Sequence, residues 1–460
     1  MQITFHGAAG TVTGSRYLVS TKSDAVLVDC GMFQGLKELR LRNWQHPDFD
    51  IADLKWIVLT HAHTDHSAYL PRLHKLGFRG QIFCSAPTAR LTQIILMDAA
   101  FLQEEDARYL NKKGATKHKP AMPLFDTSDA EAVIKLLRPV KMEQAQRLSP
   151  AFSYTLRPVG HILGACSVRL SISDNGESRT IYFSGDVGRF HSALLPDPLP
   201  AENADYVVVE STYGDRLHPS EDTWEQLAGL VDRIVANRGV LLIPAFAVER
   251  GQELVYMLHI LEDKGRIARI PIHVDSPMAV EATNIVGEFP DLLRPEVNIG
   301  HGPGGGLHST TITYHRTRDE SKELNSISGP CVIISASGML TGGRILHHLE
   351  HRMGDPANII ALAGYQAEGT RGRLLLEGAK ELRFHGDTHA VRAQVTDLAG
   401  LSAHADYAEL MRWLGPVTAP PRKVFVTHGE PAPAAAMVER IKKERGFDAL
   451  APKMGEQFPL

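Results

Sequence analysis

A cluster of side chains that can bind metal ions lies between residues 61 and 66, in the order His61-Ala-His63-Thr-Asp65-His66. Imidazole nitrogens and carboxylate oxygens are ligands that Zn²⁺ accepts. His61 and His63 are two residues apart, so their side chains lie on the same side of an extended backbone. Asp65 and His66 follow where the chain leaves that line. The spacing predicts two adjacent metal ions, one bound by the His-x-His pair and one by the Asp–His pair.

Other candidate residues stand where an apolar strand stops. The cluster itself follows the apolar residues 56–60, and Asp186, Glu210 and His428 end similar runs, while His161 lies between glycine turns. Taken singly, each is more typical of a turn or of a buried core residue. In layered α/β proteins, strand ends at one edge gather into one site. The repetition therefore predicts that these residues converge on the cluster.

One further strand-end residue, Asp29, has two interpretations. Asp29 ends the apolar run 25–28 and is followed by Cys30-Gly31. It is either a turn residue or a carboxylate that orients a metal-binding histidine, and the sequence leaves both open. After the cluster, Leu70, Leu73 and Leu76 at helical spacing predict a helix that His66 opens.

Composition limits the class of protein. The 460 residues are 43% hydrophobic and 22% charged, which is typical of a globular chain with two or three domains. A net charge of −4 gives no general basic field, so nucleic-acid binding would need local patches. The four cysteines are scattered without a Cys-x-x-Cys pair, which favours a reduced, cytoplasmic protein. We expect no signal peptide and, without an apolar run of about 18 residues, no membrane span.

The order of elements predicts an inserted domain. The first 60 residues alternate short strands with glycine turns, whereas from about residue 223 strands alternate with helices, as in a doubly wound parallel sheet. Metal-type residues precede and follow that block. We therefore expect a first domain built from residues 1–210 and 385–460, with residues 211–384 inserted.

The ordered motifs resemble a known family. His61-x-His63-x-Asp65-His66, His161, Asp186 and His428 look like the ligand motifs of the metallo-β-lactamase fold. Glu210, His404 and His428, around an inserted α/β block, resemble the extra motifs of the β-CASP nucleases, and within them the polyadenylation-endonuclease-like RNA-processing branch. The resemblance covers nearly all of the chain. It implies an αββα sandwich carrying a β-CASP domain with a doubly wound parallel sheet, which would act as a lid.

The resemblance also implies residue roles. One Zn²⁺ would be bound by His61, His63 and His161, and a second by Asp65, His66 and His428. Asp186 would bridge both ions, and a hydroxide shared between them would attack an RNA phosphodiester. As general acid for the ribose 3′ oxygen we expect His404, oriented by Glu210. These assignments give Asp186, Glu210 and His404 as the catalytic residues.

Substrate binding is expected in the inserted domain, at strand ends and helix starts, where backbone N–H groups favour phosphate. The candidates are Phe246, Arg250, Ser335, Ser337, Gly338, Arg344 and Tyr365. A tyrosine there could stack on a base of single-stranded RNA. For the two arginines, ordinary helix-surface residues are the alternative.

Three rival functions stay open at this point. They are a DNA nuclease, a hydrolase of small esters or phosphodiesters on the same metal fold, and an inactive scaffold. Family members that cut DNA generally lack a histidine at the position of His428, which favours RNA. The sequence does not distinguish endonucleolytic from 5′-exonucleolytic cleavage, and it leaves the oligomeric state open, with a homodimer as one option.

Overall fold

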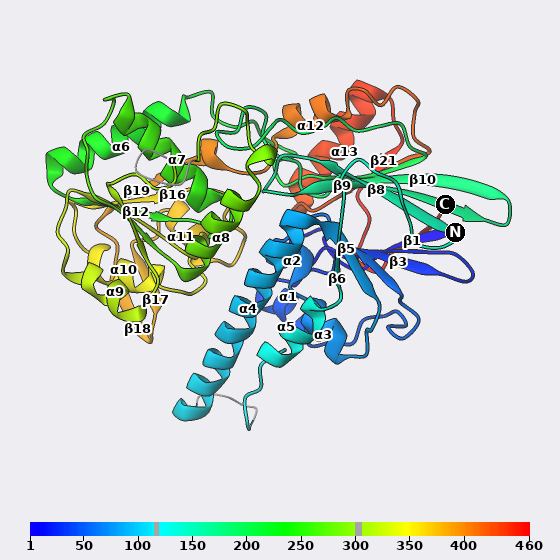
Figure 1. The fold of residues 1–460 in the computed structure, drawn as a ribbon, viewed down its shortest axis with the longest axis horizontal. Helices are drawn as coiled ribbons and strands as arrows, with labels where there is room; N and C mark the ends of the chain where they lie inside the picture. Colours follow the sequence, from blue (N-terminus) through cyan, green and yellow to red (C-terminus); the bar gives the residue numbers. More distant parts are fainter. Residues whose placement is uncertain (115–118, 300–305) are drawn as a thin grey trace. The chain divides into compact units, whose positions relative to one another are not determined.

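The chain forms two compact units in a computed structural model that describes residues 1–114, 119–299 and 306–460. Unit 1 comprises Met1–Phe190, Asp197–Leu217 and His404–Leu460, and unit 2 comprises His191–Pro196 and His218–Ala403. Each is described separately below (Figure 1).

Unit 1 contains two seven-stranded sheets. The first sheet has the order β22 (Gln457–Pro459), β1 (Gln2–Phe5), β2 (Tyr17–Ser20), β3 (Ala25–Val28), β4 (Trp56–Val58), β5 (Gln81–Ser85) and β6 (Leu137–Val140). The second has the order β21 (Ala449–Leu450), β20 (Lys423–Thr427), β11 (Tyr206–Glu210), β10 (Glu177–Phe183), β9 (Cys166–Asp174), β8 (Phe152–Pro158) and β7 (Gln146–Arg147).

Alternation along the strands creates three apolar layers. Val58 packs in the core between the two sheets, whereas its neighbours Ile57 and Leu59 join the core on the opposite face of the first sheet. Phe183 of β10 likewise faces the inter-sheet core, while Tyr182 faces the outer core of the second sheet. Because strand side chains alternate with period two, each sheet buries both faces.

Helices cover the outer faces, which gives the αββα order of layers. On the first sheet these are α2 (Thr64–Ser67), α3 (Leu70–Lys75), α4 (Ala86–Lys113) and α5 (Thr127–Ile134), and on the second α12 (Tyr407–Leu414) and α13 (Pro431–Arg445). The short helix α1 (Lys37–Arg42) buries none of its residues. In α4, the Ser85 hydroxyl accepts the Thr88 N–H and Gly114 ends the helix at φ +60°. The expected αββα sandwich is confirmed.

The helix after the metal cluster differs from the prediction. It begins at Thr64, with His63 as its N-cap, and stops after Ser67; a second helix starts at Leu70. His66 therefore lies inside the first short helix and does not open a longer one. Leu70 and Leu73 belong to the second helix, so their apolar spacing predicts that helix alone. No sequence pattern marks the break between the two helices.

Unit 2 is built on a six-stranded parallel sheet. Its order is β14 (Ile312–His315), β13 (Ile272–Asp275), β15 (Cys331–Ser335), β12 (Val240–Pro244), β16 (Ile359–Leu362) and β19 (Gln394–Asp397). Every residue of β12, β15 and β16 is buried, as in a sheet covered on both faces. The strand order matches the expected doubly wound sheet.

The remaining elements of unit 2 are helices and one hairpin. The helices are α6 (Thr223–Asn237), α7 (Arg250–Asp263), α8 (Pro277–Glu288), α9 (Arg318–Glu323), α10 (Ile345–Arg352) and α11 (Arg371–Leu376). Strands β17 (Glu381–Phe384) and β18 (Asp387–Ala390) form the hairpin. Unit 2 extends beyond residue 384, where the sequence placed its end, because β19 pairs with β16.

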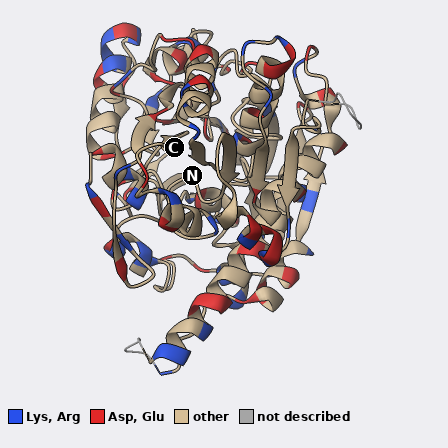
Figure 2. Ribbon diagram, turned by 90° about the vertical axis from the view of Figure 1, so that its left-hand side faces the viewer, with Lys and Arg blue, Asp and Glu red and all other residues tan. Residues whose placement is uncertain are grey.

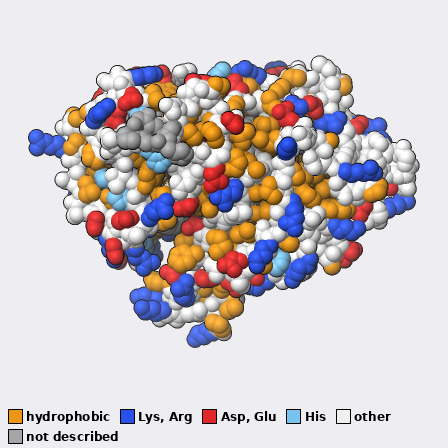
Figure 3. Space-filling model, in the orientation of Figure 1, with side chains coloured by type: hydrophobic (Ala, Val, Ile, Leu, Met, Phe, Trp, Pro, Cys, Tyr) orange, Lys and Arg blue, Asp and Glu red, His pale blue; other side chains and the backbone are white. Residues whose placement is uncertain are grey.

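Charge is mixed over the surface. Lys and Arg residues are interspersed with Asp and Glu residues on the elements of Figure 2 and on the face shown in Figure 3. Within the described residues, every helix is too short or too polar to cross a membrane.

Candidate metal centre

Strand ends of unit 1 bring the candidate ligands together. His61 and His63 follow β4, Asp65 and His66 lie in α2, His161 lies between β8 and β9, and Asp186 and His428 follow β10 and β20. Strands β10, β11 and β20 are parallel neighbours, so Asp186, Glu210 and His428 leave the sheet at one edge.

Two groups of donor atoms form at this edge. One contains His61, His63, His161 and Asp186, and the other contains Asp65, His66 and His428; within each group the donor atoms lie within 4.8 Å of one another. These are the two sets that the family resemblance implied. His61, His66, His161, Asp186 and His428 are each at most 3% exposed.

Asp186 faces both groups with different oxygens. Its Oδ2 lies 3.4 Å from Nε2 of His61 and 3.5 Å from Nε2 of His161. Its Oδ1 lies 3.2 Å from Nε2 of His66 and 3.6 Å from Nε2 of His428. One carboxylate is thus positioned to bridge two ions.

The donor set fits divalent metal ions. Nδ1 of His63 lies 3.1 Å from Nε2 of both His61 and His161, close to the ~3.3 Å expected between nitrogens bound to one tetrahedral Zn²⁺. Nε2 of His66 and Nε2 of His428 are 3.2 Å apart. Among the described residues, the buried Oδ1 of Asp186 has no hydrogen-bond partner, which a bound cation would supply.

Electrostatics favours the protonation states that metal binding requires at His61, His63 and Asp186. At His66 burial alone would lower the pKa, but Asp186 and Asp29 raise it well above its usual value. Burial, reinforced by the neighbouring His66, moves the pKa of His61 well below its usual value, and burial lowers the pKa of His63 to about 4. Burial alone would raise the pKa of Asp186, but His428, His66 and His61 hold it well below its usual value. Neutral imidazoles and an ionised carboxylate are the forms that bind metal.

His66 lies between two carboxylates. Its Nδ1 is 2.7 Å from Oδ2 of Asp29, on the side opposite Asp186. Asp29 is fully buried and accepts the backbone N–H of Thr60 at 2.8 Å, which fixes its position. Of the two interpretations of Asp29, this geometry supports the carboxylate that orients a metal-binding histidine.

Close backbone packing holds this region together. A Cβ on Gly31 would lie 1.5 Å from the carbonyl oxygen of Asp65, so only glycine allows the loop after β3 to approach α2 this closely. The N–H of Cys30 also donates to the carbonyl of His66 at 2.8 Å. The loop that carries Asp29 is therefore fixed against the segment that it orients.

Two threonines that no sequence pattern singles out contact the metal-type histidines. Oγ1 of Thr212 lies 3.1 Å from Nδ1 of His428, and Oγ1 of Thr60 lies 3.0 Å from Nδ1 of His61. Both stand at strand ends beside the candidate ligands. That position is the only available signal, because isolated threonines are common in strands.

His404 and Glu210 form a pair beside the centre. Nδ1 of His404 lies 3.2 Å from Oε2 of Glu210, and His404 is 14% exposed while Glu210 is buried. Burial alone would lower the pKa of His404, but Glu210 raises it to about 9. His404 also lies within 4.8 Å of Asp186 and His428 as a potential donor, yet its Nδ1 faces Glu210.

The residues expected to bind RNA lie in unit 2, and the structure separates them into two kinds. Phe246, Ser337, Gly338 and Tyr365 follow the ends of β12, β15 and β16, which are neighbours in the sheet. A Cβ on Gly338 would lie 2.9 Å from the Phe246 ring, so these two segments meet. Phe246, Ser337 and Tyr365 are partly exposed.

The other three candidates are engaged inside unit 2. Arg250 is 4% exposed and paired with Glu253, one turn further along α7. Ser335 is 1% exposed and donates to the carbonyl of Asp275. Arg344 bonds Asp275 and the backbone carbonyls of residues 315 and 316. We therefore do not include these three in a proposed RNA-binding surface.

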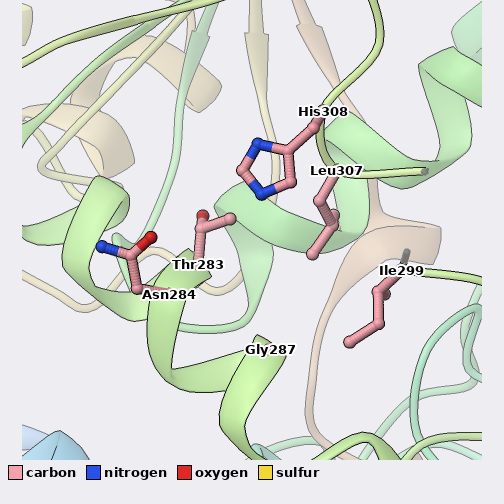
Figure 4. A pocket seen from close by; sticks show the side chains of 6 residues that line it. All are labelled: Thr283, Asn284, Gly287, Ile299, Leu307 and His308. Atoms are coloured by element: carbon pink, nitrogen blue, oxygen red, sulfur yellow. The ribbon is translucent and has the colours of Figure 1, made fainter. Parts of the chain in front are cut away.

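A cavity elsewhere in unit 2 has no catalytic group of side chains among its described lining residues. It has a volume of about 210 Å³ and is lined by Thr283, Asn284, Gly287, Ile299, Leu307 and His308 (Figure 4). His308 is the one titratable side chain among these lining residues. Such a lining offers no paired acid and base and no set of metal ligands.

Comparison with known proteins agrees with this geometry. Family models match residues 9–128 (metallo-beta-lactamase superfamily), 251–375 (Beta-Casp domain) and 388–452 (Zn-dependent metallo-hydrolase RNA specificity domain). Ribonuclease TTHA0252 of Thermus thermophilus is 36% identical over 462 residues and covers 100% of both chains. The chain belongs to the β-CASP family of the metallo-β-lactamase superfamily. As a β-CASP protein it is a metal-dependent hydrolase, as the motifs predicted.

Other β-CASP relatives carry different names. Transcription termination factor FttA of Methanocaldococcus jannaschii is 30% identical over 455 residues, which cover 96% of this chain and 69% of that protein. An RNase J-like protein of the same organism is 28% identical and covers 99% of each chain. A crystal structure of a protein of unknown function from Enterococcus faecalis, 14% identical with a TM-score of 0.55, covers 100% of this chain and 99% of its own, and shows the fold alone.

Proposed function

We propose that this β-CASP protein is a zinc-dependent ribonuclease that hydrolyses phosphodiester bonds of single-stranded RNA. The observation that carries the proposal is the position of Asp186, with one carboxylate oxygen facing His61 and His161 and the other facing His66 and His428. Relatives named as ribonucleases, and a matched segment described as an RNA specificity domain, support RNA as the substrate.

The ligand set favours two Zn²⁺ ions. His61, His63 and His161 would bind one, Asp65, His66 and His428 the other, and Asp186 both. Five imidazoles among seven donors suit zinc better than magnesium, which prefers oxygen ligands. A pair of such ions lowers the pKa of water and stabilises negative charge on phosphoryl oxygens.

His404 would supply a proton to the leaving ribose oxygen. A general acid must be protonated at working pH, and the Glu210 carboxylate raises the pKa of His404 to about 9, against the effect of burial. Because Nδ1 of His404 faces Glu210, Nε2 is the nitrogen that we expect to donate.

Glu210 would act by positioning His404. Its Oε1 accepts the backbone N–H of Val187 at 2.6 Å, and its Oε2 accepts the N–H of Thr212 at 3.3 Å. These contacts fix the carboxylate, so it can hold the imidazole in one orientation while it stabilises the imidazolium charge.

Substrate contacts in unit 2 would come from the edge where β12, β15 and β16 end. Phe246 and Tyr365 are partly exposed there and can stack on unpaired bases, and Ser337 can bond phosphate. All four cysteines are free and buried, in keeping with the reducing cytoplasm where we place the enzyme.

Incubation with end-labelled substrates tests the proposal. Single-stranded RNA and DNA of the same sequence should be compared with the zinc-loaded protein, with and without chelator. We expect RNA to be cut, DNA to be cut much more slowly, and chelator to abolish both. Equal cleavage of RNA and DNA would contradict RNA as the preferred substrate. RNA that stays intact with a fully zinc-loaded protein would contradict the proposed nuclease function. Labelled 5′ ends separate endonucleolytic fragments from released mononucleotides.

A further inference from the structure

Unit 2 carries a second group of metal-type side chains, none of them shared with the centre in unit 1. His347 and Glu350 lie on α10, and His385 lies at the turn of the β17–β18 hairpin, which lies beside α10 (Figure 1). All three side chains are exposed, so an ion could reach them from solvent.

The donor atoms converge on one carboxylate oxygen. Nδ1 of His385 lies 3.3 Å from Oε2 of Glu350, and Nδ1 of His347 lies 3.9 Å from the same oxygen. One donor atom from each residue lies within 4.8 Å of the other two. The imidazole rings of His347 and His385 have centroids 4.6 Å apart at an interplanar angle of 29°. Small side-chain rotations would place all three donors on one ion.

Regular backbone holds each of the three residues in place. His347 and Glu350 are three residues apart on a helix, so their side chains are neighbours on one face. His385 and Gly386 form the two-residue turn of the hairpin, with φ of +53° and +97°. Positive φ at both positions is typical of a type I′ turn, where Asn-Gly is the favoured sequence.

Histidine is one of the residues that tolerate the first turn position. Asn, Asp and His adopt positive φ more readily than other non-glycine residues, and hairpin formation itself does not require an imidazole. Beside it, Phe384 is 3% exposed and stacks on His389 at 4.3 Å, which anchors the hairpin. The anchored hairpin therefore holds the His385 ring next to α10.

The donor chemistry selects the type of ligand. Two imidazoles and one carboxylate form a set that Zn²⁺ accepts with a remaining position for water, whereas Mg²⁺ and Ca²⁺ prefer oxygen donors throughout. The Glu350 carboxylate at the middle of the group disfavours a phosphate.

We propose that His347, Glu350 and His385 form a binding site for one Zn²⁺ ion, in addition to the centre in unit 1, and that the ion clamps the β17–β18 hairpin onto α10. Leu382 and Phe384 of the hairpin already share a buried core with Leu349 of α10. The bound ion adds a link at the exposed turn, so its expected effect is to slow local opening of the hairpin there.

Zinc content of the full-length chain tests the site. The wild type, His385→Asn and His347→Asn should be dialysed against micromolar free Zn²⁺ and assayed for zinc per chain by elemental analysis. Asn suits the turn, so His385→Asn should fold at least as well as the wild type. His46→Asn, which removes an exposed histidine of unit 1, is the matched control.

We expect one zinc ion fewer per chain in both cluster variants than in the wild type and in the control. Equal zinc content in the wild type and the two cluster variants would overturn the proposal, as would an equal loss in the control. The test compares the zinc content of each variant with that of the wild type, so it does not depend on how many ions unit 1 binds. If the proposed nuclease function were wrong, this difference in zinc content would be unaffected.

Hydrogen exchange tests the proposed clamp without relying on the number of zinc ions per chain. Saturating Zn²⁺ should slow exchange of the amides of residues 381–390 in the wild type and not in His385→Asn. Identical exchange with and without Zn²⁺ in the wild type would exclude the clamp.

Discussion

Oε2 of Glu210 lies 3.2 Å from Nδ1 of His404, and the two residues are 194 positions apart in the chain. Glu210 is the last residue of β11. His404 lies just before α12 and forms an isolated antiparallel β-bridge with Gly188. Because backbone N–H groups hold the carboxylate, the imidazole has one preferred orientation beside Asp186. This orientation is the one that we propose for a proton donor that is not itself a metal ligand.

Replacing His404 by alanine should separate catalysis from metal binding. We expect zinc content to remain at the wild-type value while kcat for RNA falls by about 10²–10⁴-fold, the usual contribution of a general acid. Elemental analysis and single-turnover cleavage measure the two quantities. Cleavage at a near wild-type rate would contradict the role, and loss of zinc would make His404 a ligand.

Glu210→Gln keeps the shape of the side chain and removes its charge. We expect kcat to fall by about 10–100-fold with little change in KM, because the imidazolium loses its stabilising partner while RNA binding is untouched. Steady-state kinetics on a defined oligonucleotide checks this. A change confined to KM would show that Glu210 acts on binding instead.

Asp29→Asn should weaken metal binding without unfolding the protein. Asp29 has φ +60°, a conformation that Asn adopts readily, and the amide keeps the volume of the carboxylate. Removing the charge beside Nδ1 of His66 should lower zinc affinity by about 10–100-fold. Competition with a chromogenic chelator measures the affinity, and an unchanged value would assign Asp29 to the turn alone.

Thr212→Val tests the hydroxyl on Nδ1 of His428. The change is nearly isosteric, so we expect the fold to persist and zinc affinity to fall by about tenfold as His428 loses its orienting partner. Thr180→Val, which removes a hydroxyl that bonds Asp205 elsewhere on the same sheet, is the control. Equal zinc affinity in the two variants would contradict a specific role for Thr212.

His6 should make the protein less stable in acid. Burial, aided by Arg16, lowers the pKa of His6 to about 4 from 6.5, so the unfolded chain binds the proton more readily than the folded one. Stability from this group is therefore complete above pH 6.5 and is lost as pH falls towards 4, by at most about 3 kcal/mol.

Urea unfolding of the metal-free wild type and His6→Gln at pH 7.5 and pH 4.5 measures this effect. The wild type should lose more free energy of unfolding than the variant between the two pH values. Parallel losses would show that His6 titrates alike in both states.

The sequence predicted the parts of this protein that short-range patterns determine. Apolar strands that stop at Asp186, Glu210 and His428 reveal where side chains leave a sheet, and parallel neighbours bring those ends together. The break between α2 and α3 was missed, because the apolar spacing begins only in α3 and the polar residues of α2 do not mark where one helix stops and the next begins.

Contacts between distant segments that carry no motif were beyond prediction. The hydroxyl of Thr212 meets His428 across 216 residues, and an isolated threonine carries no signal of that. Arg250 begins a helix as expected, but its burial against Glu253 depends on how α7 packs within unit 2. Periodicity places a residue on an element, whereas packing decides whether its side chain reaches solvent.

Zinc titration of the metal-free protein, with cleavage of single-stranded RNA recorded at each step, tests whether two zinc ions make this protein a ribonuclease. To keep the hairpin histidines out of the count, His385→Asn should be used. We expect no cleavage without metal and a rise that saturates at two zinc ions per chain. Undiminished RNA cleavage by the metal-free protein, or a chain that saturates with zinc yet leaves RNA intact, would contradict this expectation.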